Sequence, residues 1–354
     1  MTHNNKSGYD LTLPTSNALA SNRTMIQVFV VCLHLALLIL LYGQTYSFDY
    51  VYFDDAQYVL QNSAVNSGLT VEGIQWAFTS FYMSNWHPLT WLSHMLDVSL
   101  FDTDPGWAHL HNVALHGINS LLVYALLLKI VGSWWKACVL SLIFLVHPLH
   151  VESVAWIAER KDLLCALFFL VGILQYDNYR ARPGKLRYAG VLITFVLALM
   201  AKPMAVTFPV VLLILDFFVY RKCFESNTGQ GQSIKIDYFR AILEKTPLLA
   251  LSTAMGIVTI VAQDAGNSVV YLDLHPISSR WTTAASAYLI YLKQFVMPVD
   301  LIALYEIPVS TSLIDLIIPS LTLLVLIVLS VMFAPTLPLI TLGLSWYPVS
   351  YTHL

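Results

Sequence analysis

Charged residues are scarce in this chain of 354 residues. Asp, Glu, Lys and Arg together make up 11% of it, whereas soluble domains carry about a quarter. Hydrophobic residues make up 57%, and the mean hydropathy is +0.68. This balance excludes a water-soluble globular domain and predicts a polytopic membrane protein. The net charge of −3 and the scattered basic residues exclude a groove for a nucleic acid.

Cysteine is also rare, and the cysteines lack the spacing of metal ligands. The four of them fall within apolar segments or beside a basic loop: Cys32, Cys138, Cys165 and Cys223. We expect them to be inert apolar side chains, so they say nothing about the redox compartment. The sequence also shows no internal repeat and no low-complexity tract.

Apolar runs, by contrast, fill most of the chain. A polar segment (1–24) precedes a run from Met25 to Leu41 that is too long for a cleaved signal and lacks a small-residue cleavage site, so we predict a retained first span. Further stretches lie at 110–131, 135–149, 162–178, 188–201, 203–220, 246–263, 283–297, 313–333 and 335–347. The predicted fold is an all-α bundle of nine to ten spans within residues 25–347. Interruptions such as "LMAKPMAVTFP" predict broken or re-entrant helices around a cavity.

The distribution of basic residues predicts the orientation. Residues 44–108 contain no Lys or Arg but seven acidic residues, whereas 178–188 contain four basic residues and 221–245 contain five. Because cytoplasmic loops are enriched in Lys and Arg, we expect the N-terminus and the basic loops on the cytoplasmic side. The acidic loop 44–108 and the segment 147–162 then share the opposite face, periplasmic or lumenal. The side of the segment after residue 298 stays open.

Two segments of that outer face are predicted as interfacial helices. The first is "WHPLTWLSHMLDVSLF" (86–101), in which a proline suits the first helical turn, and His87, Trp91 and His94 share one face. Tryptophan-rich surfaces of this kind lie at the level of the lipid headgroups. The second is 147–162, where acidic and basic residues surround a tryptophan.

Paired acids, Asp54 and Asp55, follow the first span in "VYFDDAQYVL". An Asp-Asp pair in an acidic loop is usually a solvated turn. Here, however, Tyr52, Phe53 and Tyr58 crowd the pair against apolar surface, where a carboxylate is partly desolvated and its basicity rises. Functional carboxylates are found in such places, so we interpret the pair as candidates for chemistry or substrate binding.

A second cluster lies where an apolar span meets the outer surface, in "HPLHVESVAWIAERKD". Neighbouring charges there can form surface ion pairs, with His147 and His150 as interfacial hydrogen-bond formers. Alternatively, Arg160 and Lys161 bind an anionic headgroup, since Arg binds phosphate oxygens through two hydrogen bonds and Lys acts as a point charge. His147, His150 and Glu152 could also hold a metal, although His-x-x-His is a weak signal.

Two further features allow both structural and functional interpretations. Lys202 stands between two apolar stretches, where it either extends to the outer interface or points into a cavity as another phosphate ligand. Polar residues also recur at helical spacing along the second span, and we predict that they form interhelical hydrogen bonds. They are His109, Asn112, His116 and Asn119.

Several stretches together resemble the membrane half of the transmembrane and tetratricopeptide-repeat O-mannosyltransferase family and its bacterial relatives, within the GT-C glycosyltransferase superfamily. They are "FDDAQYVLQN", "WHPLTWLSHMLD", "LVHPLHVESVAWIAERKDLL", "MAKPMAVTFPVVLLILD" and "YLKQFVMPVDLIALYEIP". The resemblance spans roughly residues 45 to 310 and implies a GT-C-type bundle. It also implies a polyprenyl-phosphate-linked sugar as donor and a reaction on the non-cytoplasmic face, which is the periplasmic face of a bacterial inner membrane or the lumenal face of the endoplasmic reticulum.

Residue roles follow from that resemblance. Asp54 or Asp55 would be the general base that deprotonates a Ser or Thr hydroxyl of a protein acceptor as it attacks the anomeric carbon of a sugar such as mannose, with inversion. Charge on the departing lipid phosphate would be stabilised by Arg160, Lys161 and Lys202. Four side chains would shape the site: His87, His147, His150 and Glu152. The cations make a divalent metal unnecessary, while the paired aspartates leave room for one, so the metal stays open.

Three alternative functions make different demands on the sequence. The acceptor could be a glycolipid or an envelope glycan rather than a protein. A transporter of lipid-linked sugars would predict charges deep within the spans and repeated halves, whereas a silent scaffold would tolerate the loss of both aspartates. The family continues into a tetratricopeptide-repeat array and this chain ends at Leu354 without one, so we expect the tail, 348–354, to be truncated before such a domain.

Overall fold

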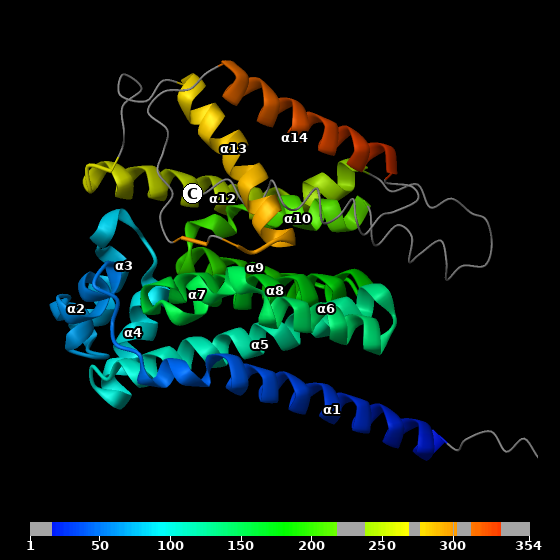
Figure 1. Cartoon of the computed structure of the whole chain (residues 1–354), viewed down its shortest axis with the longest axis horizontal. Coiled ribbons are helices and arrows are strands. Elements are labelled where there is room, and N and C mark those ends of the chain that lie inside the picture. Colours follow the sequence, from blue (N-terminus) through cyan, green and yellow to red (C-terminus); the bar gives the residue numbers. More distant parts are fainter. Residues whose placement is uncertain (1–15, 218–237, 269–276, 300, 303–312, 334–354) are drawn as a thin grey trace, which may run out of the picture.

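The computed structural model describes residues 16–217, 238–268, 277–299, 301–302 and 313–333. Every regular element within these ranges is a helix, as the composition predicts. The helices of a layered bundle (Figure 1) are α1 (Ser16–Tyr42), α5 (Pro105–Val131), α6 (Trp134–Val146), α8 (Arg160–Ala181), α9 (Lys185–Ala201), α10 (Phe208–Leu215), α12 (Tyr238–Ala265), α13 (Ile277–Val296) and α14 (Leu313–Phe333). Three further helices, α2 (Ser63–Asn66), α3 (Val71–Thr79) and α4 (Pro88–Phe101), gather at one end of it, and α7 (Val151–Ala155) follows α6.

Nine of the ten predicted apolar stretches contain a helix, and the tenth, 335–347, lies outside the described residues. The number of membrane spans is not confirmed. Three helices are long and apolar enough to cross a membrane, within Arg23–Ser47, Pro105–Val131 and Ala241–Ala265, and a bent pair of helices adds a fourth if it counts as one span. The protein is therefore a membrane protein, but α6, α9 and α10, with 13, 17 and 8 residues, are too short to qualify singly.

The predicted helix breaks occur at X-Pro sequences. Between α6 and the segment Pro148–Ala155 the chain bends by 51°. After α9 ends at Ala201, Lys202 adopts an extended conformation (φ −152°, ψ 132°), because a residue that precedes a proline is disfavoured in the helical region. A short 3₁₀ turn, Pro203–Thr207, then leads into α10. The first break leaves His147 against α13, and the second leaves Lys202 near α4.

Three of the four polar residues predicted to join α5 to its neighbours do so, whereas His109 lies near the Asp49 carbonyl, outside any helix. The Asn112 side chain donates from Nδ2 to the Trp156 carbonyl (3.0 Å), and Asn119 donates from Nδ2 to the Leu163 carbonyl (2.9 Å). The His116 ring nitrogen Nε2 lies 3.0 Å from the Leu145 carbonyl oxygen. All three side chains are buried. These contacts tie α5 to α6 and to the start of α8.

The helix predicted over 86–101 is present as α4, but its tryptophan face does not lie at the membrane surface. Trp91 is fully buried, and its ring packs on those of Tyr58 and Trp76, with centroids 4.7 and 5.4 Å apart. His87 and His94 are buried on the same face. The outer loop is long enough to form a core of its own, and burying a large aromatic ring there is more favourable than leaving it at the interface.

Candidate functional site

The two aspartates of the outer loop occupy different environments. A helix begins at Asp54, after a turn at Tyr52 and Phe53. The Asp55 carboxylate is fully buried, and its two oxygens accept hydrogen bonds from the backbone N–H groups of Val51 (2.9 Å) and Ala158 (2.8 Å). Burial raises the pKa of Asp55, and these two donors offset part of the rise. Asp55 therefore fastens the first loop to the segment that follows α7.

Asp54 is half-buried, and its carboxylate has no hydrogen-bond or ion-pair partner among the residues that the structure describes. Its charge acts on Tyr58, as do the charges of Lys161 and Glu159. The aspartate and these charged side chains thus surround one buried tyrosine ring. The sequence did not distinguish the two aspartates. In the structure, Asp55 is bound to two backbone N–H groups, and the Asp54 carboxylate is the one without a partner among the described residues.

A cluster of alternating charges lies at the junction of the 3₁₀ turn Ile157–Glu159 with α8 and at the break after α9. Lys161 pairs with Glu159 (2.7 Å) and lies 5.1 Å above the Tyr58 ring centroid. Lys202 pairs with Asp162 and lies 3.8 Å from Glu159. Burial alone would lower the pKa of Lys161, but Tyr58 and Glu159 outweigh it and raise that pKa above its usual value. Both lysines are thus charged and close together.

Arg160, the third cation predicted at the phosphate, points into the protein interior instead. Its side chain is fully buried, and its guanidinium pairs with Asp97, donates to the Asn112 side chain (2.8 Å) and donates to the Ala108 carbonyl (2.7 Å). In this conformation it offers no donor to a ligand. Sequence reasoning missed Asp97, whose place in an acidic loop gave no sign of a buried partner.

Two of the predicted site histidines, His147 and His150, lie together with ring centroids 6.3 Å apart, whereas His87 is buried against Tyr58 and Trp91. Burial, followed by the charges of Lys161 and Lys202, lowers the pKa of His87 to about 3, so this ring is neutral. His147 lies against α13, with Nε2 3.0 Å from the Phe295 carbonyl oxygen, and the His150 ring packs on Phe144 with centroids 4.4 Å apart. Among the described residues, no group of three or more His, Cys, Asp or Glu side chains is arranged to hold a metal ion.

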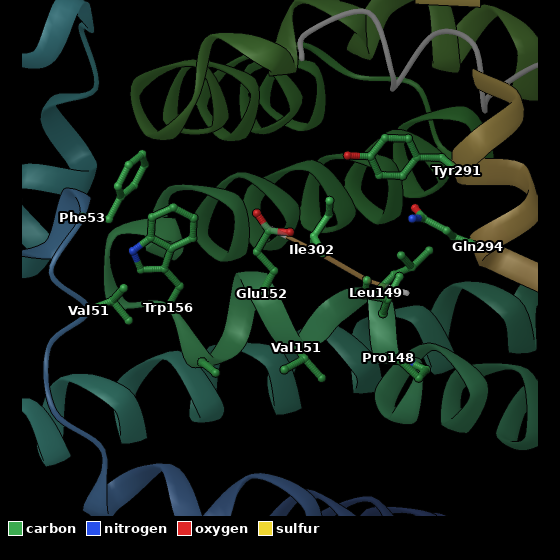
Figure 2. Close-up of a pocket in the computed structure, with 12 residues that line it drawn as sticks. Val51, Phe53, Pro148, Leu149, Val151, Glu152, Trp156, Tyr291, Gln294 and Ile302 are labelled. Atoms are coloured by element: carbon green, nitrogen blue, oxygen red, sulfur yellow. The ribbon is translucent and has the colours of Figure 1, made fainter. Parts of the chain in front are cut away.

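A cavity of about 520 Å³ includes Phe53, the residue before Asp54, and Glu152 in its lining, whereas Asp54, Lys161 and Lys202 do not line it. Figure 2 shows Val51, Phe53 and Trp156 on one side of it and Tyr291 and Gln294 of α13 on the other, with the Glu152 carboxylate pointing into the space between them. The remaining lining is mostly apolar: Pro148, Leu149, Val151, Ala155, Leu301 and Ile302.

The position of Glu152 links this cavity to the charged cluster. Its carboxylate experiences the charges of Asp162, Lys202 and Lys161. On the other side of the cavity, Phe53 packs on Trp156 with ring centroids 5.8 Å apart, and Asp54 follows Phe53 in the chain. The arrangement combines an available carboxylate, a pair of lysines and an apolar cavity. Such a site can take an amphipathic anion and abstract a proton next to it.

Sequence comparison confirms the resemblance to the O-mannosyltransferases. The chain is 31% identical to "Protein O-mannosyl-transferase TMTC1" of Mus musculus over 151 residues, which are 39% of this chain and 16% of that protein. It is 33% identical to "Protein O-mannosyl-transferase TMTC4" of Mus musculus over 160 residues (39% and 21%), and 30% identical to "Protein O-mannosyl-transferase F38B6.6" of Caenorhabditis elegans over 185 residues (49% and 26%).

These matches cover about a sixth to a quarter of the length of the relatives. No protein-family model matches the chain, and no solved structure matches it. The names of these relatives indicate glycosyl transfer to protein.

Proposed function

We propose that this protein is a membrane glycosyltransferase that moves a sugar, in the first instance mannose, from a polyprenyl phosphate to a Ser or Thr hydroxyl of a protein on the non-cytoplasmic face. The names of the similar proteins support the reaction class. In this reaction the hydroxyl oxygen attacks the anomeric carbon, the bond from that carbon to the phosphate oxygen breaks, and the configuration inverts. The electron pair leaves with the lipid phosphate.

The observation that carries the proposal is the difference between the two aspartates. Both Asp55 oxygens accept backbone hydrogen bonds. Asp54, by contrast, is half-buried, and no described residue forms a hydrogen bond or an ion pair with its carboxylate. A general base must be able to reach the proton that it abstracts. Asp54 is therefore the base that takes the proton of the attacking hydroxyl, and Asp55 holds the turn that presents it.

The lysine pair supplies the positive charge for the leaving group. Lys161 and Lys202 both approach Glu159, and their ammonium groups can exchange a carboxylate partner for a phosphate oxygen. Fixed cations at a departing phosphate stabilise the charge that develops in the transition state. Arg160 acts indirectly, because its bonds to Asp97 and Asn112 fix the start of α8, where Lys161 lies.

The neighbouring cavity suits the rest of the donor. Its apolar walls can take the first part of a polyprenyl chain, and the Glu152 carboxylate can accept hydrogen bonds from sugar hydroxyls. This assignment places the sugar between the lysines and Asp54. It also gives the Phe53–Trp156 pair a role as an apolar wall for the sugar ring or the lipid.

The test compares Asp54→Asn with Asp55→Asn in membranes that carry the full-length protein, with a radiolabelled polyprenyl-phosphate mannose as donor. We expect Asp54→Asn to lower transfer by about 10²–10⁴-fold, the usual contribution of a general base, while donor binding persists. Asp55→Asn should instead lower the unfolding temperature, because a buried carboxylate that accepts two backbone hydrogen bonds is replaced. Wild-type transfer by Asp54→Asn would show that the base has been assigned wrongly.

A further inference from the structure

A second cavity, separate from the first, lies within the outer loop. It has a volume of about 420 Å³ and is formed by the residues that precede α2, by α2 itself and by the first turns of α3. It shares no lining residue with the first cavity. Its volume is in the range of roughly 300–1,000 Å³ that is usual for small-molecule sites. The proposed transfer reaction does not use it.

The lining of this cavity is polar and nearly neutral. Glu72 is the one charged side chain among the residues that form it, and the others include Gln61, Asn62, Ser67 and Thr70. Phosphates and carboxylates are bound by Arg, Lys or clustered N–H groups, so this lining does not suit an anion. Hydroxyl and amide groups together with a carboxylate suit a ligand whose own groups both donate and accept hydrogen bonds.

Asn62 offers a hydrogen-bond donor that the protein does not use. Only 4% of the residue is exposed, and its Oδ1 accepts from the backbone N–H groups of Ala64 (3.1 Å) and Val65 (3.3 Å), which cap α2. The capping bonds fix the orientation of the amide. Its Nδ2 is buried, with no acceptor among the residues that the structure describes. A buried donor without a partner is uncommon and calls for an explanation, and a ligand acceptor in this cavity provides one.

The cavity also has an aromatic wall with a fixed orientation. Trp76 is half-buried, and its ring packs on Tyr82 (centroids 5.7 Å apart, planes at 58°) and on Trp91 (5.4 Å, 60°). Because these contacts hold the ring without covering it completely, part of it lines the cavity beside the amide and carboxylate groups. The C–H face of a sugar ring is apolar while its rim carries hydroxyls, so it matches a wall that is aromatic on one side and polar on the other.

We propose that this outer-loop cavity is a second, non-catalytic binding site for a neutral hexopyranose unit. Trp76 stacks on the ring, Asn62 Nδ2 donates to a hydroxyl oxygen, and the Glu72 carboxylate accepts from a hydroxyl. The site would hold a sugar that is already attached to an acceptor or product. It stands independently of the transfer reaction, since none of its residues belongs to the first cavity.

The test measures binding of methyl α-mannopyranoside and methyl α-glucopyranoside to the full-length protein in nanodiscs by saturation-transfer NMR. Asn62→Asp is the decisive variant, because the carboxylate keeps the capping acceptor while a negatively charged acceptor oxygen replaces the Nδ2 donor. Glu72→Gln, at an exposed position, is the second variant. The matched control is Gln75→Glu, an exposed residue of α3 that does not line the cavity. All binding is repeated in a Glu152→Ala background, which removes the proposed sugar-binding carboxylate of the first cavity and so separates this site from the first.

We expect at least one of the two hexosides to bind wild-type protein, and its affinity to fall by tenfold or more in Asn62→Asp and Glu72→Gln but not in Gln75→Glu. The signal should survive Glu152→Ala even where transfer is lost. Absence of binding to wild-type protein, or unchanged binding in both cavity variants, would overturn the assignment. A third outcome would also overturn it. If Asn62→Asp abolishes the binding of a sugar-free Ser/Thr peptide but leaves the binding of the hexosides unchanged, the cavity is a peptide site.

Discussion

The two ends of the helical bundle hold their ion pairs in different ways. At the end near the outer loop, the side chains of Lys202 and Asp162 are 24% and 31% exposed. Toward the other end, Lys245 pairs with Asp216, with side chains 0% and 1% exposed, and Tyr176 donates to the same carboxylate (2.7 Å). The first pair lies close enough to Glu152, which lines the first cavity, to act on its charge, whereas the second is enclosed between α8, α12 and the end of α10.

The difference separates two uses of charge in one membrane protein. A fully enclosed pair cannot exchange partners without leaving a charge unpaired in a medium of low dielectric constant, so Lys245 and Asp216 fix helices in place. A partly exposed lysine can exchange its carboxylate for a ligand at little cost, because water compensates for the partner that it leaves. On this comparison, a variant at one end changes stability and a variant at the other changes function.

The largest expected effect on stability is that of Lys245→Met. It removes the buried ammonium group from Asp216, which keeps the Arg180 guanidinium at 3.4 Å, and we expect the free energy of unfolding to fall by about 3 kcal/mol. Denaturant titration of the protein in mixed micelles measures the change. The double variant Lys245→Met/Asp216→Leu should recover much of the loss, since it removes both charges. A single variant as stable as wild type would show that this pair does not hold the helices.

Next in size is the effect of Lys202→Gln on transfer. Removing one cation from the departing phosphate should lower the transfer rate by about 10²–10³-fold, while stability changes by about 1 kcal/mol or less because the pair is partly exposed. Lys129→Gln is the control, as Lys129 pairs with Asp177 (2.5 Å) outside the candidate site. Equal transfer rates in these two variants would remove the functional distinction between the two ends.

The smallest expected effect concerns pH and the buried His87. Its pKa is lowered to about 3 by burial and then by Lys161 and Lys202, whereas in the unfolded chain it titrates near 6.5. The unfolded state therefore takes up a proton first, so the free energy of unfolding falls as the pH drops below about 6.5. We expect a loss of about 1 kcal/mol between pH 6.5 and 5.5, where the slope for one group approaches roughly 1.4 kcal/mol per pH unit.

The control for this effect is His87→Gln, in which unfolding is measured over the same pH range. The variant should show a shallower pH dependence than wild type. Some slope will remain, because burial also lowers the pKa of His94 well below its usual value. An identical slope in wild type and variant would mean that His87 does not titrate between the folded and unfolded states.

Much of the fold could be predicted because apolar runs and prolines act locally. The runs mark the helices, and "AKP" marks the break at Lys202. The hydrogen bonds of the polar face of α5 could also be predicted. Residues at helical spacing share a face, and polar side chains within an apolar bundle form hydrogen bonds with neighbouring segments. The aromatic face of α4 was placed wrongly, because helical periodicity identifies a face without naming what covers it, and Tyr58 and Trp76 cover it from elsewhere in the loop.

The candidate site was only partly predictable for the same reason. Its residue types and neighbourhood followed from the sequence, including both aspartates and the lysines. From the sequence, Arg160 could not be distinguished from Lys161, because the two are adjacent and both positively charged. Successive residues at the start of a helix point in different directions, so one guanidinium faces Asp97 in the interior while the neighbouring ammonium faces Glu159.

The sequence by itself determined that this is an all-helical membrane protein with acids and bases gathered around an outer loop, because hydrophobicity and local propensity are properties of short segments. Tertiary structure alone decided which of those charged groups are buried and paired within the protein. It buried Asp55 and Arg160 against groups 103 and 63 residues away, and it left Asp54 without a partner among the described residues and the lysine pair near Glu152, which lines a cavity. Desolvation and hydrogen-bond partners depend on the packing of distant segments, and those two factors govern whether a charged group supports the fold or is available to a substrate.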